Sequence, residues 1–330
     1  MQAVIEPGVG ATVLRHRVDR VRPSSSHFCK KDNMQFPHCT WVRRACLVAL
    51  GLIAGLGSSA RAQGEKGKPP SAAPPTDFPV TQAWKDFKML RVCGDPENMP
   101  FSDQKAEGFE NKIAEVIASA LGDSVVYTWW PHRRGFVRNT LSAGECDVVM
   151  GVPAGYDPVL TTNPYYRSTY YIVTRSDRHL DIQSLDDERL KTMKVGVGLI
   201  GDDYTNTPPA QALTSHGMTK NVRGFSLFYD EDTHPQDIVN AVANGTIDVA
   251  FVWGPVAGYF AKESPVPLRL KALPDSDNAS GVLFAYNVAI GVRHSDRDLK
   301  ATLDSLLTQK RDTIQGILRA YNVPTIDVKH

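Results

Sequence analysis

The chain has 330 residues, of which 42% are hydrophobic and 22% are charged, and its formal net charge is +1. This is an ordinary globular composition. Residues 1–62 hold nine basic and three acidic residues, a net of +6, so the remaining 268 residues carry a net charge of −5. A mildly acidic body argues against nucleic acid as a partner.

The N-terminal region has the pattern of a leader. Two arginines precede an apolar run at 45–56, and an Ala-Arg-Ala motif ends at Ala62. This order predicts a secretory signal peptide that starts at Met34 and is cleaved near Ala62, with residues 1–33 as a non-native extension or a disordered arm. The run is too short for a membrane span. We therefore expect no membrane span and a secreted protein.

A Pro- and Gly-rich stretch at 63–83 predicts a flexible linker. The segments that follow alternate in type: a strand at 90–93, a helix at 108–121, a strand at 125–130, a helix at 133–143 and a strand at 146–150. Apolar residues of the helix at 108–121 fall on one face. The order βαβαβ predicts a parallel sheet with right-handed crossovers.

The strand at 146–150 is the centre of this unit. It is an apolar run without alternation, left through Gly151 and Pro153, and such a run is typical of a parallel strand covered on both faces. A loop, the tripeptide 164–166 and a further strand through 170–173 follow. Ligands of open α/β sheets bind just beyond strand carboxyl ends. We therefore expect a ligand cleft after this strand.

A second unit repeats the pattern, down to residues 244–249 mirroring residues 143–148. Its predicted elements are a helical turn at 184–190, a strand at 194–197, a helix at 208–216, a strand at 222–228, a helix at 235–244, a strand at 248–253 and a helix at 255–262. A strand at 268–273, a long strand at 284–292 and two closing helices between 299 and 318 follow. Two similar α/β lobes are therefore expected.

The first lobe is expected to be discontinuous in sequence. Residues 84–172 and 284–330 form the predicted first lobe, and residues 173–283 form the second. The chain then crosses between lobes twice, near Tyr171 and near Ala285. Two such crossings predict a two-strand hinge with a cleft between the lobes.

Two cysteines, Cys93 and Cys146, remain after the leader. An oxidising compartment favours a disulfide between them. However, they lie toward opposite ends of two predicted neighbouring strands, which argues for too large a separation. The pairing stays open at this point, with two buried thiols slightly favoured. The sequence has no metal-ligand spacing.

The order of elements from 90 to about 321 resembles the type II periplasmic solute-binding proteins. A narrower resemblance is to the quinoprotein-dehydrogenase-associated binding proteins, the accessory J proteins (MxaJ and XoxJ type) of bacterial methanol oxidation. It rests on LRVCGDP at 90–96, PFS at 100–102, EGFEN at 107–111, WWP at 129–131, RRGFVRNT at 133–140, CDVVMGVP at 146–153, TT at 161–162 and PYYRST at 164–169.

This resemblance implies a periplasmic, non-enzymatic accessory of a pyrroloquinoline-quinone (PQQ)-dependent methanol dehydrogenase. It would act by binding the dehydrogenase, its cytochrome c or a small organic ligand, in maturation or activation of the enzyme. We expect a monomer without cofactor or metal. Two alternatives stay open, a substrate-binding component of an ABC transporter for a small organic solute and a periplasmic lyase-type enzyme.

The sequence departs from amino-acid-binding relatives of the fold at two places. These relatives hold the ligand carboxylate with an Arg after the third strand, whereas the loop 157–162 has none, and Trp253 stands where their second lobe has an acid. An unpaired buried carboxylate costs several kcal/mol, much of the roughly 8 kcal/mol of a micromolar complex. A free amino acid is therefore not expected, unless Arg133, Arg134 or Arg167 turns inward.

The cleft is expected to be lined by rings, basic side chains and strand-end residues. The candidates are Asp95, Phe101, Glu107, Trp130, Arg133, Arg134, Gly151, Val152, Pro153, Thr161, Tyr165, Tyr166, Arg167, Asp202, Tyr204, Trp253 and Pro255. The alternative for Asp95 is a turn residue, and for the helix face that carries Arg134 and Arg138 it is plain solvation. Trp129 is expected in the core.

Enzymatic signatures are weak. The sequence lacks HExxH, GxSxG, a P-loop and a Cys/His pairing. A GxGxxG match at 196–201 suggests dinucleotide binding, but two prolines delay the next helix and no acid lies about twenty residues on. For the lyase alternative, Asp95, Glu107 or Asp202 would supply the acid.

Overall fold

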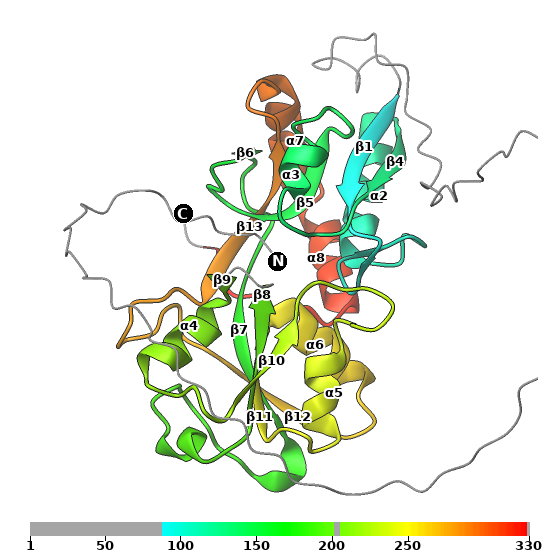
Figure 1. Ribbon diagram of the computed structural model, residues 1–330. Coiled ribbons are helices and arrows are strands. Elements are labelled where there is room, and N and C mark those ends of the chain that lie inside the picture. Colours follow the sequence, from blue (N-terminus) through cyan, green and yellow to red (C-terminus); the bar gives the residue numbers. More distant parts are fainter. Residues whose placement is uncertain (1–87, 201–204, 329–330) are drawn as a thin grey trace, which may run out of the picture. The chain divides into compact units, whose positions relative to one another are not determined.

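The computed structural model describes residues 88–200 and 205–328. The predicted leader and linker, and the candidates Asp202 and Tyr204, lie outside the described residues. The described strands are linked by hydrogen bonds in the order β10-β8-β11-β7-β13-β5-β1-β4 (Figure 1). Strand β7 (Tyr166–Arg175) is central to this path, because its first half pairs with β13 and its second half pairs with β11 and β12, one along each edge.

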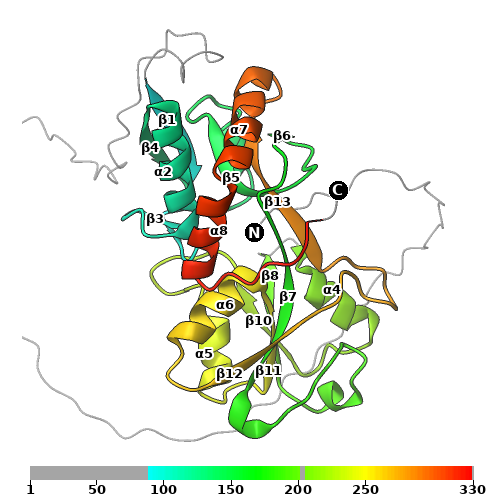
Figure 2. The ribbon, with the colours of Figure 1, turned by 180° about the vertical axis from the view of Figure 1, so that it is seen from behind.

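The strands linked to the first half of β7 through β13, with their helices, are called the first lobe. Strands β1 and β5 are parallel, and so are β1 and β4, as the sequence predicts. Helices α2, α7 and α8 pack beside these strands (Figure 2). The elements are β1 (Met89–Gly94), β2 (Glu97–Asn98), β3 (Ser102–Asp103), α2 (Phe109–Leu121), β4 (Ser124–Trp129), α3 (Phe136–Asn139), β5 (Val148–Pro153), β6 (Leu160–Thr161), β13 (Ala285–Val292), α7 (Arg297–Gln309) and α8 (Arg311–Ala320).

The elements linked to the second half of β7 are called the second lobe. Strands β8 and β10 are parallel, as are β8 and β11, whereas β11 and β12 both run antiparallel to β7. The elements are two 3₁₀ helices (Ser176–Arg178 and Glu188–Lys191), β8 (Val195–Ile200), β9 (Thr205–Asn206), α4 (Pro208–Ser215), β10 (Val222–Ser226), α5 (Asp237–Ala243), β11 (Val249–Trp253), α6 (Gly254–Glu263) and β12 (Leu268–Ala272).

Helix α2 follows from its sequence. Phe109, Ile113 and Ile117 recur at helical spacing and are fully buried, so this face packs into the first-lobe core. The Asn111 side chain accepts a hydrogen bond from the backbone N–H of Gly108 (3.0 Å) at the start of the helix. Gly122 ends it in the left-handed region, at φ 78°, where glycine carries no steric penalty.

The predicted helix at 133–143 is wrong in length. Only Phe136–Asn139 is helical, although Phe136 and Leu141 are buried as expected. Gly135 stands at φ 86° immediately before the helix, and Thr140 leaves the helical region at φ −121° and ψ −83°. Both backbone conformations interrupt the i to i−4 hydrogen bonds, so most of this segment forms turns rather than a helix.

Cys93 and Cys146 form a disulfide with a Cα–Cα distance of 5.5 Å, so the preference for buried thiols is wrong. In the register of β1 and β5, Cys93 lies opposite Val149. Cys146 precedes the first residue of β5, so strand pairing does not fix its distance from Cys93. The half-cystines are buried in a small apolar cluster with Phe136 and Leu141.

A buried carboxylate next to the disulfide connects three segments of the first lobe. Asp147 is fully buried and accepts hydrogen bonds from Arg91 Nε (2.9 Å) and Nη2 (2.6 Å) and from Arg293 Nη2 (2.9 Å). Arg293 also pairs with Asp296 at 2.6 Å. Paired arginines offset the cost of burying the Asp147 charge, and they connect β1 and the end of β13 to the start of β5.

The chain after α8 follows strand β7. The backbone N–H of Ile326 donates to the Arg167 carbonyl (2.9 Å), and the Ser168 hydroxyl donates to the Pro324 carbonyl (2.6 Å). Asn322 Nδ2 donates to the carbonyl of Gly258 in α6, at 2.7 Å. The C-terminal segment therefore contacts both β7 and the second lobe. Among the described helices, none is long and apolar enough to cross a membrane.

Candidate functional site

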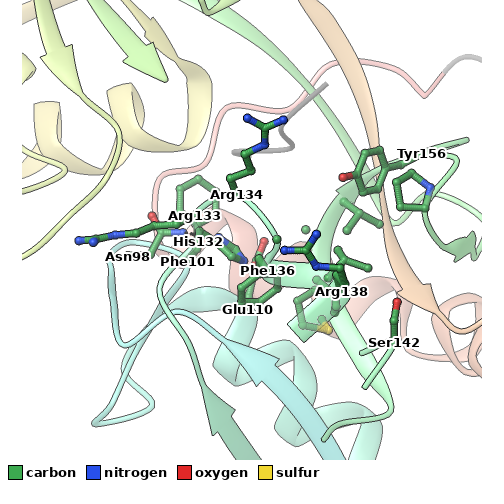
Figure 3. Close-up of a pocket in the computed structure, with 17 residues that line it drawn as sticks. Asn98, Phe101, Glu110, His132, Arg133, Arg134, Phe136, Arg138, Ser142 and Tyr156 are labelled. Carbon is green, nitrogen blue, oxygen red and sulfur yellow. Dashed lines mark hydrogen bonds between the residues drawn. The ribbon is translucent and has the colours of Figure 1, made fainter. Parts of the chain in front are cut away.

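A cavity of about 360 Å³ lies at the carboxyl end of β5 (Figure 3). Its apolar wall includes Phe101, Phe136, Val149, Met150 and Val152, and its polar lining comprises Asn98, Glu110, His132, Arg133, Arg134, Arg138, Ser142 and Tyr156. We call it the first-lobe cavity, because α2, β5, the segment 132–138 and neighbouring loops of the first lobe form it. Its position matches the rule that ligands bind beyond strand carboxyl ends.

Glu110, in the first turn of α2, is the acidic residue of the cavity lining. Its side chain is 6% exposed, and Oε1 has no hydrogen-bond partner among the described residues. Burial raises the pKa of Glu110 to about 7, because the low-dielectric surroundings disfavour the charged form. Gly151 permits this position: at φ 71°, a Cβ there would lie 2.1 Å from Oε1.

Asp95 is held by the backbone. Its Oδ1 accepts from the N–H of Glu97 (2.9 Å) and its Oδ2 from the N–H of His132 (2.6 Å). The contact with Glu97 closes a turn, whereas the contact with His132 spans 37 residues and places His132 at the cavity, where its ring lies edge-on to Phe136 at 4.1 Å. Burial lowers the pKa of His132 to about 4 despite the opposing effect of Asp95, so this ring is neutral at neutral pH.

Three exposed arginines lie on the same short segment. Arg133 Nη2 approaches Asp230 Oδ2 of the second lobe at 3.9 Å, and about half of each side chain is exposed, so the pair contributes little. Figure 3 shows the Arg138 guanidinium extending between Phe136 and Tyr156, and Arg133 pointing to the other side. With three cations and one titratable acid in the lining, the cavity is electropositive.

A second, smaller hollow of about 40 Å³ adjoins Phe101, which lines both spaces. It is mainly apolar. Trp253 is 6% exposed there, edge-on to Tyr170 at 5.2 Å and to Tyr286 at 6.1 Å. The indole Nε1 lacks a hydrogen-bond partner among the described residues. This space suits an apolar group rather than the ammonium of an amino acid.

The structure brings some of the predicted site residues together. Phe101, Arg133, Arg134, Gly151 and Val152 line the first-lobe cavity, Trp253 lines the second hollow, and Asp95 lines a hollow of about 10 Å³ beside Glu110. The other described candidates line none of these three spaces: Glu107, Trp130, Pro153, Thr161, Tyr165, Tyr166, Arg167 and Pro255.

The positions of those other candidates have physical reasons. Arg167 is buried and pairs with Asp275 at 2.8 Å, so it does not turn toward a ligand. Tyr165 and Tyr166 are core side chains, and their rings contact each other edge-on at 5.1 Å. Trp130 is 42% exposed, so it is neither a core side chain nor part of these cavities.

Sequence reasoning missed Glu110, His132, Asn98 and Tyr156. A signal existed for Glu110, because it precedes Ile113, Ala114 and Ile117 at spacings of three, four and seven residues. These spacings place an acid on the buried face of a helix. For His132 there was no comparable signal, because a turn held by Asp95 sets its position.

Comparison with known proteins resolves the family. No family model matches the chain. Protein MoxJ of Methylorubrum extorquens is 33% identical over 303 residues, which cover 87% of this chain and 95% of that protein. The chain belongs to the MoxJ family. A second MoxJ family member, from Paracoccus denitrificans, is 30% identical over 75% of this chain and 92% of its own length.

Solved structures agree with membership of the MoxJ family. MxaJ from Methylophaga aminisulfidivorans MPT matches with a TM-score of 0.64 and 26% identity, and the periplasmic binding protein XoxJ from Methylobacterium extorquens AM1 with 0.60 and 35%. Each match covers 72% of this chain and 100% of the other. An ancestral cationic amino acid solute-binding protein matches with a TM-score of 0.58 and 20% identity. This match covers 74% of this chain and 99% of the other. The resemblance to MxaJ and XoxJ and the type II periplasmic-binding-protein fold are thus confirmed.

Proposed function

We propose that this MoxJ-family protein is a periplasmic accessory of a PQQ-dependent methanol dehydrogenase system. It acts by binding, not catalysis, in maturation or activation of the dehydrogenase, after a signal peptide is removed near Ala62. The observation that carries this proposal is the relationship to MoxJ over 87% of the chain. The match to XoxJ, itself described as a periplasmic binding protein, supports the compartment.

The chemistry of the cleft supports an accessory over an amino-acid transporter component. The loop 157–162 lacks the Arg that would hold a ligand carboxylate in amino-acid-binding relatives. Trp253, among aromatic neighbours, occupies the second-lobe position where these relatives have an acid. The ammonium of a zwitterion would therefore lack an acidic partner in the second lobe, and burying an unpaired charge costs several kcal/mol.

The segment 130–138 is the surface that we assign to a protein partner. Trp130 and the three arginines are exposed along it, and Trp and Arg are the residue types most enriched at interface hot spots. The mature chain is acidic overall, so this patch has the opposite charge to the rest of the chain. A partner with an acidic, partly apolar patch fits it.

Deletion of the gene tests the proposed function in a methanol-grown host. We expect dehydrogenase activity in the periplasm to fall and the wild-type chain to crosslink to the dehydrogenase or its cytochrome c. The double variant Trp130→Ala with Arg134→Ala should lose the crosslink, whereas Arg311→Ala, an exposed arginine on α8, should keep it. Unchanged activity together with no association would refute the proposal.

One observation favours a second candidate, a lyase-type enzyme. Glu110 is a buried carboxyl beside a cavity, and its pKa of about 7 suits general acid or base catalysis at neutral pH. The earlier candidates fit less well, because both Asp95 oxygens accept backbone hydrogen bonds and Glu107 is exposed. Substrate turnover abolished by Glu110→Gln would identify such an enzyme.

A further inference from the structure

The charges around the first-lobe cavity are unbalanced. Arg133, Arg134 and Arg138 line it, and Glu110 is its one acidic side chain. No ion pair or hydrogen bond is recorded for the Arg138 side chain within residues 88–200 and 205–328. Its guanidinium extends over the cavity beside Tyr156 (Figure 3). A planar guanidinium with free donors binds carboxylates in bidentate fashion, so this side of the cavity suits a carboxylate.

Glu110 presents a different group to the cavity. The Glu110 carboxyl is nine-tenths buried, and its Oε1 lacks a partner among the described residues. In its neutral form a carboxyl donates one hydrogen bond. An uncharged acceptor such as a carbonyl would satisfy it, whereas a second anion would be repelled once the carboxyl ionises.

No other titratable group that we name near Glu110 takes over its role as the group that gains or loses a proton near neutral pH. The rings of Tyr127, Tyr165 and Tyr166 stay neutral, because burial raises the pKa of each phenol well above the neutral range. Burial keeps His132 neutral as well. Asp95 already accepts two backbone hydrogen bonds.

Much of the remaining wall is apolar. Phe101, Phe136, Met150 and Val152 line it, and the volume of about 360 Å³ lies in the range of small-molecule pockets. An inorganic anion would leave this wall uncovered, and an amino acid would bring its ammonium toward the arginines. Both are therefore poor occupants.

We propose that the first-lobe cavity binds a small organic carboxylate that also carries an apolar group and an uncharged hydrogen-bond acceptor. Arg138 binds the carboxylate, and the protonated Glu110 carboxyl donates to the acceptor. This assignment rests on the proposed function, since it takes the cavity to be a binding site, and it names the chemical class of ligand.

Titration calorimetry with matched probes tests this assignment. The probe 4-acetylbenzoate has the carboxylate, the apolar ring and the acceptor. Its amide, 4-acetylbenzamide, lacks the charge, and 4-isopropylbenzoate lacks the acceptor. We expect 4-acetylbenzoate to bind at pH 6, the amide to bind about tenfold more weakly or worse, and 4-isopropylbenzoate to lose a few-fold, as the loss of one charged or neutral hydrogen bond implies. Sulfate should not compete.

Variants separate the two polar contacts. Arg138→Gln should weaken 4-acetylbenzoate about tenfold, and Arg311→Gln, the matched control on α8, should leave it unchanged. Wild-type affinity should fall roughly tenfold from pH 6 to pH 8 as Glu110 ionises, whereas the Glu110→Gln variant, which still donates a hydrogen bond, should show no such fall. Circular dichroism confirms that each variant is folded.

Three results would overturn the assignment. These are equal affinity for the amide and the carboxylate, unchanged affinity in Arg138→Gln, and no heat from 4-acetylbenzoate or from the shorter 4-oxopentanoate at millimolar concentration. Failure here is distinguishable from failure of the proposed function, because association with the dehydrogenase is measured by crosslinking and does not use these probes.

Discussion

Replacing Glu110 by Gln should stabilise the protein at alkaline pH and leave it unchanged at acidic pH. Burial raises the pKa of this carboxyl from 4.5 to about 7 in the folded protein. Below pH 4.5 both the folded and the unfolded chain hold the proton, so the full stability is present. As the pH rises toward 7 the unfolded chain releases its proton first, and the folded state loses stability relative to it.

The size of the effect follows from the shift in pKa. Each pKa unit corresponds to about 1.4 kcal/mol, so a shift from 4.5 to about 7 corresponds to about 3 kcal/mol at pH 8. Gln has nearly the same shape as the protonated acid and cannot ionise. The variant should therefore unfold with a free energy close to that of the wild type at pH 4 and about 3 kcal/mol greater at pH 8.

Urea unfolding followed by tryptophan fluorescence measures both free energies across this range. The difference between variant and wild type isolates Glu110, because all other groups titrate in both proteins. A difference that does not change between pH 4 and pH 8 would refute the reasoning, since it would mean that the ionised carboxylate finds water or a partner without cost.

Three further changes have defined outcomes in the same unfolding assay. Replacing Cys93 and Cys146 by Ala opens a crosslink across 53 residues and should cost about 4 kcal/mol; an unchanged midpoint would argue against the bridge. Gly151→Ala should cost about 1 to 2 kcal/mol from its φ of 71° alone, and more because the new Cβ would lie 2.1 Å from Glu110 Oε1. Glu110→Ala should remove only this second part. Asp147→Ala removes the buried partner of two arginines and should cost about 3 to 5 kcal/mol of stability. Asp147→Asn should retain part of that stability. A loss below 1 kcal/mol in Asp147→Ala would contradict this account of the network.

Local signals in the sequence were sufficient for most of the elements. Helix α2 was predicted from the helical spacing of Ile113 and Ile117, and strands β5 and β11 from apolar runs without alternation. Such patterns are local, and burial of one helix face or of both strand faces follows from them directly. The family resemblance was also recognised from short sequence motifs, many of which lie near predicted strand ends and turns.

The disulfide and the set of residues that line the cavity could not be predicted from local signals in the sequence. The separation of Cys93 and Cys146 depends on how the chain enters β5, and strand spacing alone suggested a distance too long for a bridge. Arg167 was a candidate ligand, but its partner Asp275 is 108 residues away in sequence. Pairings over such separations are decided by packing, which composition and periodicity do not report.

By itself, the sequence determined the alternation of strands and helices, the repeated lobe pattern and the family. Only the tertiary structure decided which side chains share the first-lobe cavity. Glu110 shows the reason. Its place on the buried face of α2 follows from spacing within one helix, whereas its lack of a partner, its proximity to Gly151 and its raised pKa follow from the contact of α2 with β5. Desolvation is a property of the packed surroundings, so it arises only when distant segments fold together.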